Sequence, residues 1–178
     1  MYKAEKEHID EAPKDKPTHD FDTSIDTLEN RSGETIILSS EHIKDHYKLK
    51  DLNNCEIIIH AIYKTLYLEN IKSCRIYSGV VENSVFGKNI VDSTIDCIAQ
   101  QIRIHEAKDT NFNVFVISNM IIEDSKGLKI REWKPNDSEI GKLFNQCLFK
   151  GKINNWADVK DFNWIKVIQS PNFEIINE

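Results

Sequence analysis

The most regular feature of the chain is a series of short apolar runs separated by polar corners. From Gly33 onward, Ile, Val, Leu and Phe recur between clusters of Asn, Asp, Ser, Lys and Gly. The segment 49–57 lines up with 68–76, 87–95 and 106–114, and each copy begins 19 positions after the last. A weaker copy at 122–130 follows after a step of 16. A fixed period near twenty with short strands indicates a solenoid.

Among solenoids, the pattern favours a β-helix. Leucine-rich repeats share the period, but they need a Leu/Asn consensus that is missing here. In a β-helix each coil is one rung, and equivalent positions stack at the strand spacing of about 4.8 Å. Because side chains alternate along a strand, the row Glu56, Arg75, Thr94 and Asn113 should face solvent. The predicted inward columns are Ile57, Ile76, Ile95 and Val114; Ile59, Ser78, Cys97 and Val116; and Cys55, Cys74, Ser93 and Phe112.

The two ends of the chain depart from the repeat. Residues 1–32 carry two prolines, dense charge and few apolar residues, which predicts a disordered N-terminal tail. Residues 33–178 then form one all-β domain. Within it, residues from about 135 to 178 are expected to form a non-repetitive C-terminal cap, because an uncapped solenoid exposes unpaired backbone. The run 158–161 is compatible with a short helix.

Composition limits the classes of partner that the chain can bind. The formal charge of −6 argues against nucleic acid or anionic lipid as the main partner. No apolar run approaches 18 residues, no signal peptide is evident, and Tyr2 stands where N-myristoylation needs glycine. We therefore expect a cytoplasmic protein without a membrane anchor. The four cysteines form no CxxC pair, so no metal site and no cofactor is expected. Cys55 and Cys74 should stack within disulfide reach, although buried reduced thiols are the simpler interpretation.

The candidate chemistry lies in the segment 100–105, Gln-Gln-Ile-Arg-Ile-His. In a strand, Gln101 and Arg103 point to the same face, while Ile102 and Ile104 point inward. This arrangement places an amide beside a permanently charged guanidinium on a rigid outer surface. Such a pair is able to reach into the nucleotide site of another protein.

Several motifs together resemble the cofactor C homology (C-CAP/cofactor C-like) domain family. They comprise Asn54-Cys55, Cys74, 78–85, 100–105 and 121–124, followed by the runs 154–164 and 170–173, which are similar to the tubulin-folding branch of that family. The resemblance implies a right-handed parallel β-helix and a GTPase-activating function. Its partner would be β-tubulin in an assembly with cofactors D and E, in a cytoskeleton-associated setting. The family normally carries an N-terminal helical domain, so the chain is expected to be a shortened relative or a fragment.

The same resemblance implies roles for individual residues. Arg103 is the arginine finger, and Gln101 contacts the catalytic region or orients Arg103. Glu123, one rung later, would hold the guanidinium in place. His105 and Phe162 are candidate partner contacts, with Phe162 also packing the C-terminal segment onto the β-helix. A finger supplied in trans contributes roughly 10³–10⁵ in rate, whereas a plain Arg103–Glu123 surface ion pair is worth about 0–1 kcal/mol.

Two other functions stay open. The first keeps the chemistry but takes an Arl-type small GTPase as the partner. The second is a non-catalytic actin- or tubulin-binding scaffold. The missing myristoylation glycine and the run Asp161-Phe162-Asn163-Trp164 favour tubulin, and the Gln101/Arg103 pair argues against a pure scaffold. The chain has no GxxxxGK[ST] motif, which is consistent with a helper that has no nucleotide site of its own.

Overall fold

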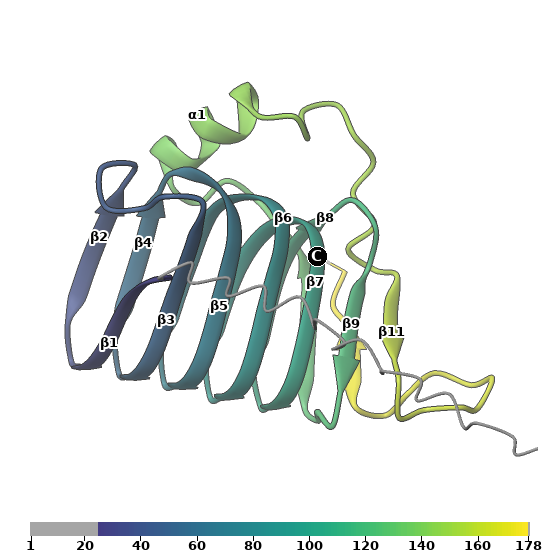
Figure 1. The fold of residues 1–178 in the computed structure, drawn as a ribbon. Helices are drawn as coiled ribbons and strands as arrows, with labels where there is room; N and C mark the ends of the chain where they lie inside the picture. The colour runs from purple at the N-terminus through teal and green to yellow at the C-terminus, as the bar shows by residue number, and fades with distance from the viewer. Residues whose placement is uncertain (1–24, 178) are drawn as a thin grey trace, which may run out of the picture.

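Strands far apart in the sequence stack side by side and in parallel, as the repeat predicts. The computed structural model describes residues 25–177, which wind through about six turns of a β-solenoid (Figure 1). The predicted parallel β-helix with a spacing of about 19 residues is therefore confirmed. Its strands form two walls, which are distinguished here by their pairing.

The first wall carries the candidate chemistry. Its strands pair in register from one end to the other, for example Leu49 with Leu68 and Ile104 with Ile122. The long strands β6 and β7 bend at a corner, so that only their second parts belong to this wall. The wall comprises β1 (Asp26–Ser32), β3 (His46–Asn53), β5 (Ile62–Lys72), the ends of β6 (Arg75–Val91) and β7 (Thr94–Lys108), β9 (Met120–Glu123) and β11 (Val159–Asp161).

The second wall closes the other side of each rung. Ile57 pairs with Ile76, and Ile76 pairs with Ile95. This wall comprises β2 (Thr35–Ser39), β4 (Glu56–His60), the first parts of β6 and β7, β8 (Asn111–Val116), β10 (Leu128–Glu132) and β12 (Phe173–Ile175).

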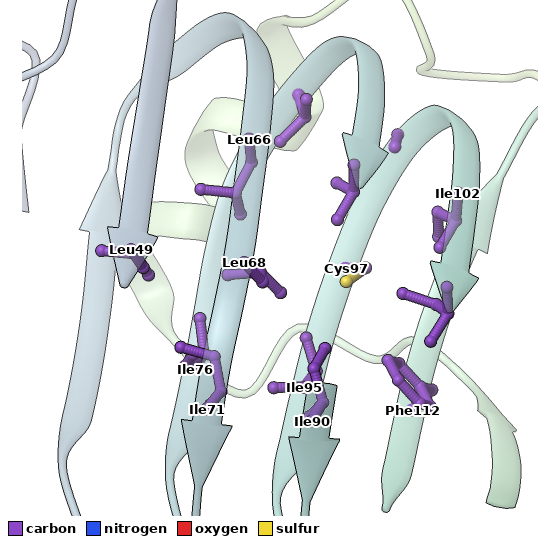
Figure 2. Close-up of a cluster of buried hydrophobic side chains, with 14 of the residues drawn as sticks. Leu49, Leu66, Leu68, Ile71, Ile76, Ile90, Ile95, Cys97, Ile102 and Phe112 are labelled. Carbon is purple, nitrogen blue, oxygen red and sulfur yellow. The ribbon is translucent and has the colours of Figure 1, made fainter. Parts of the chain in front are cut away.

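Alternating apolar residues from both walls fill the interior (Figure 2). Leu68 from the first wall and Ile76 from the second are almost fully buried. Burial of such a side chain contributes about 1.5–3 kcal/mol, so stacked columns of them hold the rungs together. Cys97 lies in the same core, and burial raises the pKa of its thiol. Cys55, Cys74, Cys97 and Cys147 all carry free thiols.

Short polar side chains form a ladder along one corner of the solenoid. Cys74, Ser93 and Thr110 each accept a hydrogen bond from a backbone N–H of the preceding rung, at 3.4, 3.1 and 3.4 Å respectively. Each also donates to the carbonyl two residues earlier. The ladder supplies acceptors where the turning backbone leaves N–H groups unpaired. Thr110, rather than the predicted Phe112, therefore continues the column of Cys55, Cys74 and Ser93.

The prediction that Val114 follows Ile95 is also wrong. Ile95 lies beside Phe112, and Cys97 lies beside Val114 in the place expected for Val116. The cause is a shorter corner in β7, where the register shifts twice against β6. The sequence separation between paired residues falls at each shift: it is 19 for Tyr77 and Asp96, 18 for Val80 and Ile98, and 17 for Ser84 and Gln101. The step between rungs falls from 19 to 17 residues, and a change of two preserves the inward–outward alternation.

The solenoid begins earlier than the predicted boundary at Gly33. Strand β1 pairs with β3, and Leu28 of β1 lies beside Leu49 and packs against the core. Pairing with a neighbouring rung thus overrides the polar local composition of residues 26–32. The rest of the predicted tail, residues 1–24, lies outside the described residues.

The C-terminal part departs from the repeat as predicted, but not in the predicted form. The run Val159–Asp161 is strand β11, paired with β9, because the free edge of β9 offers backbone partners that a helix cannot use. The helix α1 (Ser138–Gln146) lies earlier in the chain. Its apolar face, through Ile140, packs over Val80 and Ile98 on the outside of the solenoid. At 9 residues, this single helix of the described region is too short to cross a bilayer.

Candidate functional site

Strand β7 presents the predicted pair in the expected orientation. Ile102 and Ile104 are buried in the core, whereas Arg103 is exposed and Gln101 is half-buried. Gln101 lies beside Ser84 of the preceding rung, and no hydrogen bond engages its side chain within residues 25–177. Gln100 is more exposed than Gln101; its carbonyl accepts a bond of 2.7 Å from the Ser118 hydroxyl.

Arg103 belongs to a row of outward side chains that crosses the first wall. Its neighbour on the preceding rung is Phe86, and its neighbour on the following rung is Ile121. Phe86 stacks on Tyr67 with ring centres 5.5 Å apart. This apolar surround was not predicted, because the row becomes visible only with the 17-residue step that sets Phe86 beside Arg103.

The guanidinium of Arg103 lies against an aromatic ring. Its carbon is 5.8 Å from the centre of the Phe162 ring, a distance at which a cation and a ring face attract. Within residues 25–177, no carboxylate forms an ion pair with Arg103. The expected clasp by Glu123 is absent, since Glu123 lies beside His105 and Ile121 occupies the place next to Arg103. The positive charge therefore stays unneutralised by this part of the chain.

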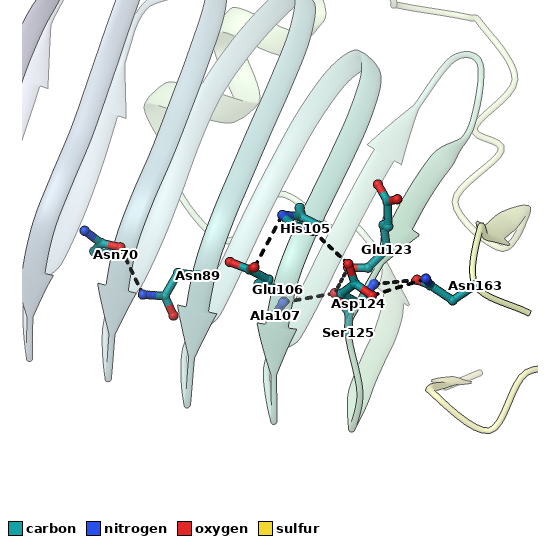
Figure 3. A network of polar contacts seen from close by, with 9 residues as sticks. All are labelled: Asn70, Asn89, His105, Glu106, Ala107, Glu123, Asp124, Ser125 and Asn163. Carbon is teal, nitrogen blue, oxygen red and sulfur yellow. Dashed lines mark hydrogen bonds and ion pairs between the residues drawn. The ribbon is translucent and has the colours of Figure 1, made fainter.

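His105 is engaged within the molecule. Its Nε2 lies 2.9 Å from Oδ2 of Asp124, and its Nδ1 lies 3.9 Å from Glu106 (Figure 3). Asn163 completes this network: its Oδ1 accepts from the Asp124 backbone N–H at 2.6 Å, and its Nδ2 donates to Oδ1 of Asp124 at 3.2 Å. The network joins the strand that carries Arg103 to the segment after β11. Glu123 takes part in the polar contacts of Figure 3 through its backbone carbonyl, which accepts from the Ser125 hydroxyl at 2.9 Å.

A shallow hollow of about 230 Å³ lies next to the guanidinium. Its wall combines apolar surface with a few polar groups, so it suits a small projecting group of another molecule. It is lined by Phe86, Gly87, Arg103, Ile104, His105, Ile121 and Glu123. Most of the predicted site residues therefore lie together at one end of the first wall: Arg103, His105, Glu123 and Phe162. Gln101 lies two positions before Arg103 on β7.

A second polar cluster lies on the second wall. Arg75 lies 3.5 Å from the buried carboxylate of Asp96, and Asn113 donates to the same carboxylate at 3.0 Å. Burial raises the pKa of Asp96, although both neighbours favour its charged form. Asn113 was expected in the row of Thr94; the shorter rung places it beside Asp96 instead.

Neither cluster offers the ligands of a metal centre. Among residues 25–177, no three His, Cys, Asp or Glu side chains gather closely enough to bind a metal ion.

These features define a class of protein: a parallel β-solenoid that displays, among apolar side chains on one wall, an arginine that no carboxylate of residues 25–177 neutralises. The sequence comparison narrows the class. Residues 44–162 match the family Tubulin binding cofactor C, and the chain belongs to this family.

The relatives carry names related to tubulin. The chain is 32% identical over 152 residues to Tubulin-folding cofactor C of Arabidopsis thaliana, covering 85% of this chain and 44% of that protein. It is 36% identical over 131 residues to Tubulin-specific chaperone C of Homo sapiens, covering 73% and 38% respectively. For the protein of the same name from Bos taurus, identity is 31% over 166 residues, covering 92% and 48%. The chain thus spans less than half the length of these relatives.

Proposed function

We propose that this chain acts in tubulin folding by stimulating GTP hydrolysis on β-tubulin, held in an assembly with cofactors D and E. Membership of the Tubulin binding cofactor C family supports the choice of tubulin. The chain contributes no nucleotide site in this scheme. It supplies one side chain, Arg103, to a nucleotide bound by its partner.

The proposal depends mainly on the environment of the Arg103 side chain. Its side chain is exposed, it has no carboxylate partner within the described residues, and its backbone belongs to a strand paired on both sides. Hydrolysis of GTP develops negative charge on the phosphate oxygens, and a planar guanidinium donates to two of them at once. A finger that is already positioned loses little freedom on docking, so more of its attraction reaches the transition state.

The test is a GTPase assay on tubulin with cofactors D and E, with and without this chain. Stimulation by the wild-type chain, and its loss in Arg103→Ala, is the expected result. Arg31→Ala is a matched control, because Arg31 is also an exposed arginine of the first wall, 4.0 Å from Glu34. Stimulation that survives Arg103→Ala would refute the finger.

The same assay separates the other two functions. An Arl-type small GTPase replaces tubulin in a parallel series; stimulation there and not on tubulin would transfer the chemistry to that partner. If the wild-type chain binds tubulin but stimulates neither GTPase, the β-solenoid acts as a scaffold.

A further inference from the structure

An apolar loop projects from the end of the first wall, immediately after β11. We name residues 162–168 the apolar loop; it is part of the extended C-terminal segment between β11 and β12 (Figure 1). The exposed fractions of Ile165, Val167 and Ile168 are 96%, 106% and 69%. Isolated exposed apolar residues are common, but three in four consecutive positions on one projection mark a contact surface.

The apolar loop has a defined internal structure. The indole Nε1 of Trp164 donates to the carbonyl of Ile168 at 2.8 Å, which closes the tip of the loop. Lys166 lies 5.0 Å above the Trp164 ring. The tip therefore turns its one charged side chain toward the indole while Ile165 and Val167 face solvent.

The base of the apolar loop is clasped by a single carboxylate. Asp161 accepts hydrogen bonds from the Asn163 backbone N–H at 3.0 Å, from the Ser170 hydroxyl at 2.6 Å and from the Asn172 amide at 2.7 Å. Asn163 lies at the beginning of the loop, whereas Ser170 and Asn172 follow its end, so the Asp161 side chain joins the two ends of the loop. A loop held in this way pays less entropy on binding than a free one.

The apolar loop and Arg103 lie at the same end of the molecule and are linked by contacts. Phe162, the first residue of the loop, packs against the guanidinium, and Asn163 bonds to Asp124 of the His105 network. We propose that the apolar loop docks into an apolar groove of the same GTPase whose nucleotide receives Arg103. This inference rests on the proposed function: the loop supplies affinity and orientation, and the arginine supplies the chemistry.

A protein partner fits the loop better than a membrane. Anchoring at an anionic bilayer needs several basic residues near the inserted apolar groups. The apolar loop carries only Lys166, and the nearby Lys160 is paired with Asp158 at 2.6 Å. The formal charge of the whole chain is −6, which opposes binding to an anionic surface.

The test separates binding from chemistry in the full chain. The loop variant is Ile165→Ser with Val167→Ser and Ile168→Ser, and all three positions are exposed, so folding should be unaffected. Its matched control is Leu148→Ser with Ile153→Ser, two residues 74% and 78% exposed in the segment after α1. The stimulated GTPase rate of tubulin is measured as a function of activator concentration for both variants and for Arg103→Ala. Direct binding to fluorescently labelled tubulin is measured alongside.

We expect the loop variant to need at least about tenfold more protein for half-maximal stimulation, with an unchanged maximal rate. Arg103→Ala should show the opposite: binding within about threefold of wild type and loss of the maximal rate. An unchanged half-maximal concentration in the loop variant would overturn the docking role and leave the finger intact. If no GTPase is stimulated but the loop variant still binds tubulin more weakly, docking stands and the proposed chemistry fails. Loop-dependent flotation with phosphatidylserine vesicles, or loop-dependent dimerisation, without an effect on tubulin binding would also overturn the inference.

Discussion

The guanidinium of Arg103 rests 5.8 Å from the ring centre of Phe162, although Arg103 lies on β7, Phe162 lies just after β11, and the two are almost 60 positions apart in the sequence. The contact exists because β11 adds to the edge of β9 and thereby places Phe162 at the end of the first wall. An aromatic face restrains the arginine without neutralising it, whereas a carboxylate at the same place would compete with phosphate for the guanidinium.

Replacing Phe162 tests this restraint. Phe162→Leu keeps an apolar side chain but removes the ring face, and a cation–ring attraction at an exposed site is worth about 0.5–1 kcal/mol. We expect the maximal stimulated GTPase rate to fall about two- to fivefold. Phe162→Tyr, which keeps the ring, should stay within about twofold of wild type. Equal losses in the two variants would show that the ring face is not what matters.

If Arg103 acts as the proposed finger, the geometry of its side chain should matter more than its charge. Arg103→Lys keeps one positive charge but loses the fork that donates to two oxygens. We expect at least a tenfold fall in the maximal stimulated rate, and about 10³ or more for Arg103→Ala. Full activity of the lysine variant in the same assay would reduce the role of Arg103 to a point charge.

The polar ladder predicts a specific loss of stability. In Ser93→Ala, the buried N–H of Cys74 loses its acceptor at 3.1 Å, which should lower the free energy of unfolding by about 1–3 kcal/mol. Ser93→Cys should be milder, because the thiol of Cys74 already fills the preceding position of the ladder. Urea unfolding followed by circular dichroism measures both, and equal midpoints for Ala and Cys would contradict the ladder.

The N-terminal cap of α1 predicts that the stability of the protein depends on pH. Burial alone would raise the pKa of Asp137, but hydrogen bonds from the Ile140 N–H and from His60 outweigh it and lower the pKa below its usual value. Asp137 therefore contributes stability above its unfolded pKa of about 3.9, and this contribution is lost as the pH falls through the lower folded value.

Asp137→Ala should cost about 1 kcal/mol at pH 7, while Asp137→Asn preserves the cap. The difference in stability between wild type and Asp137→Asn should shrink below about pH 4. Thermal unfolding over a pH series measures it. A difference that stays constant down to pH 2 would exclude the charge as its source.

Gly79 is required for two separable reasons. Its φ is +65°, and a Cβ there would lie 2.6 Å from the Ile59 carbonyl oxygen and 2.7 Å from that of Ala61. Gly33 shares the positive φ, at +68°, but its Cβ would meet nothing within 4 Å. Gly33→Ala should lower the free energy of unfolding by about 1 kcal/mol, and Gly79→Ala should lower it by about 2 kcal/mol or more. Equal shifts in the urea midpoint would mean that the crowding at Gly79 is relieved at no cost.

The fold was largely predictable because its two signals, the period and the alternation, are local. Ile102 and Ile104 point inward and Arg103 outward for the same reason that any strand alternates. Residues 26–32 were missed because their strand pairing depends on a neighbouring rung rather than on their own composition. The same applies to 159–161, which become a strand only at the edge of β9.

The surroundings of the candidate site were less predictable than its central residue. Glu123 was expected to contact Arg103, but lateral neighbours depend on the exact register, and Ile121 takes that place. The contacts of Phe162 and Asn163 come from a segment outside the repeat, whose path no periodicity describes. The contact between His105 and Asp124 could have been predicted, because an imidazole and a carboxylate stand 19 residues apart, which is the repeat length.

The shortened corner of β7 has a consequence for how such a protein can change. With a full 19-residue step, His105 instead of Arg103 would lie beside Phe86, and the guanidinium would sit two residues, or about 6.6 Å, further back along the wall. The hydrophobic interior would hardly register the difference, since the same faces still point inward. A change of register by two residues at a corner therefore moves an outward side chain along the outside of a solenoid without redesigning the core.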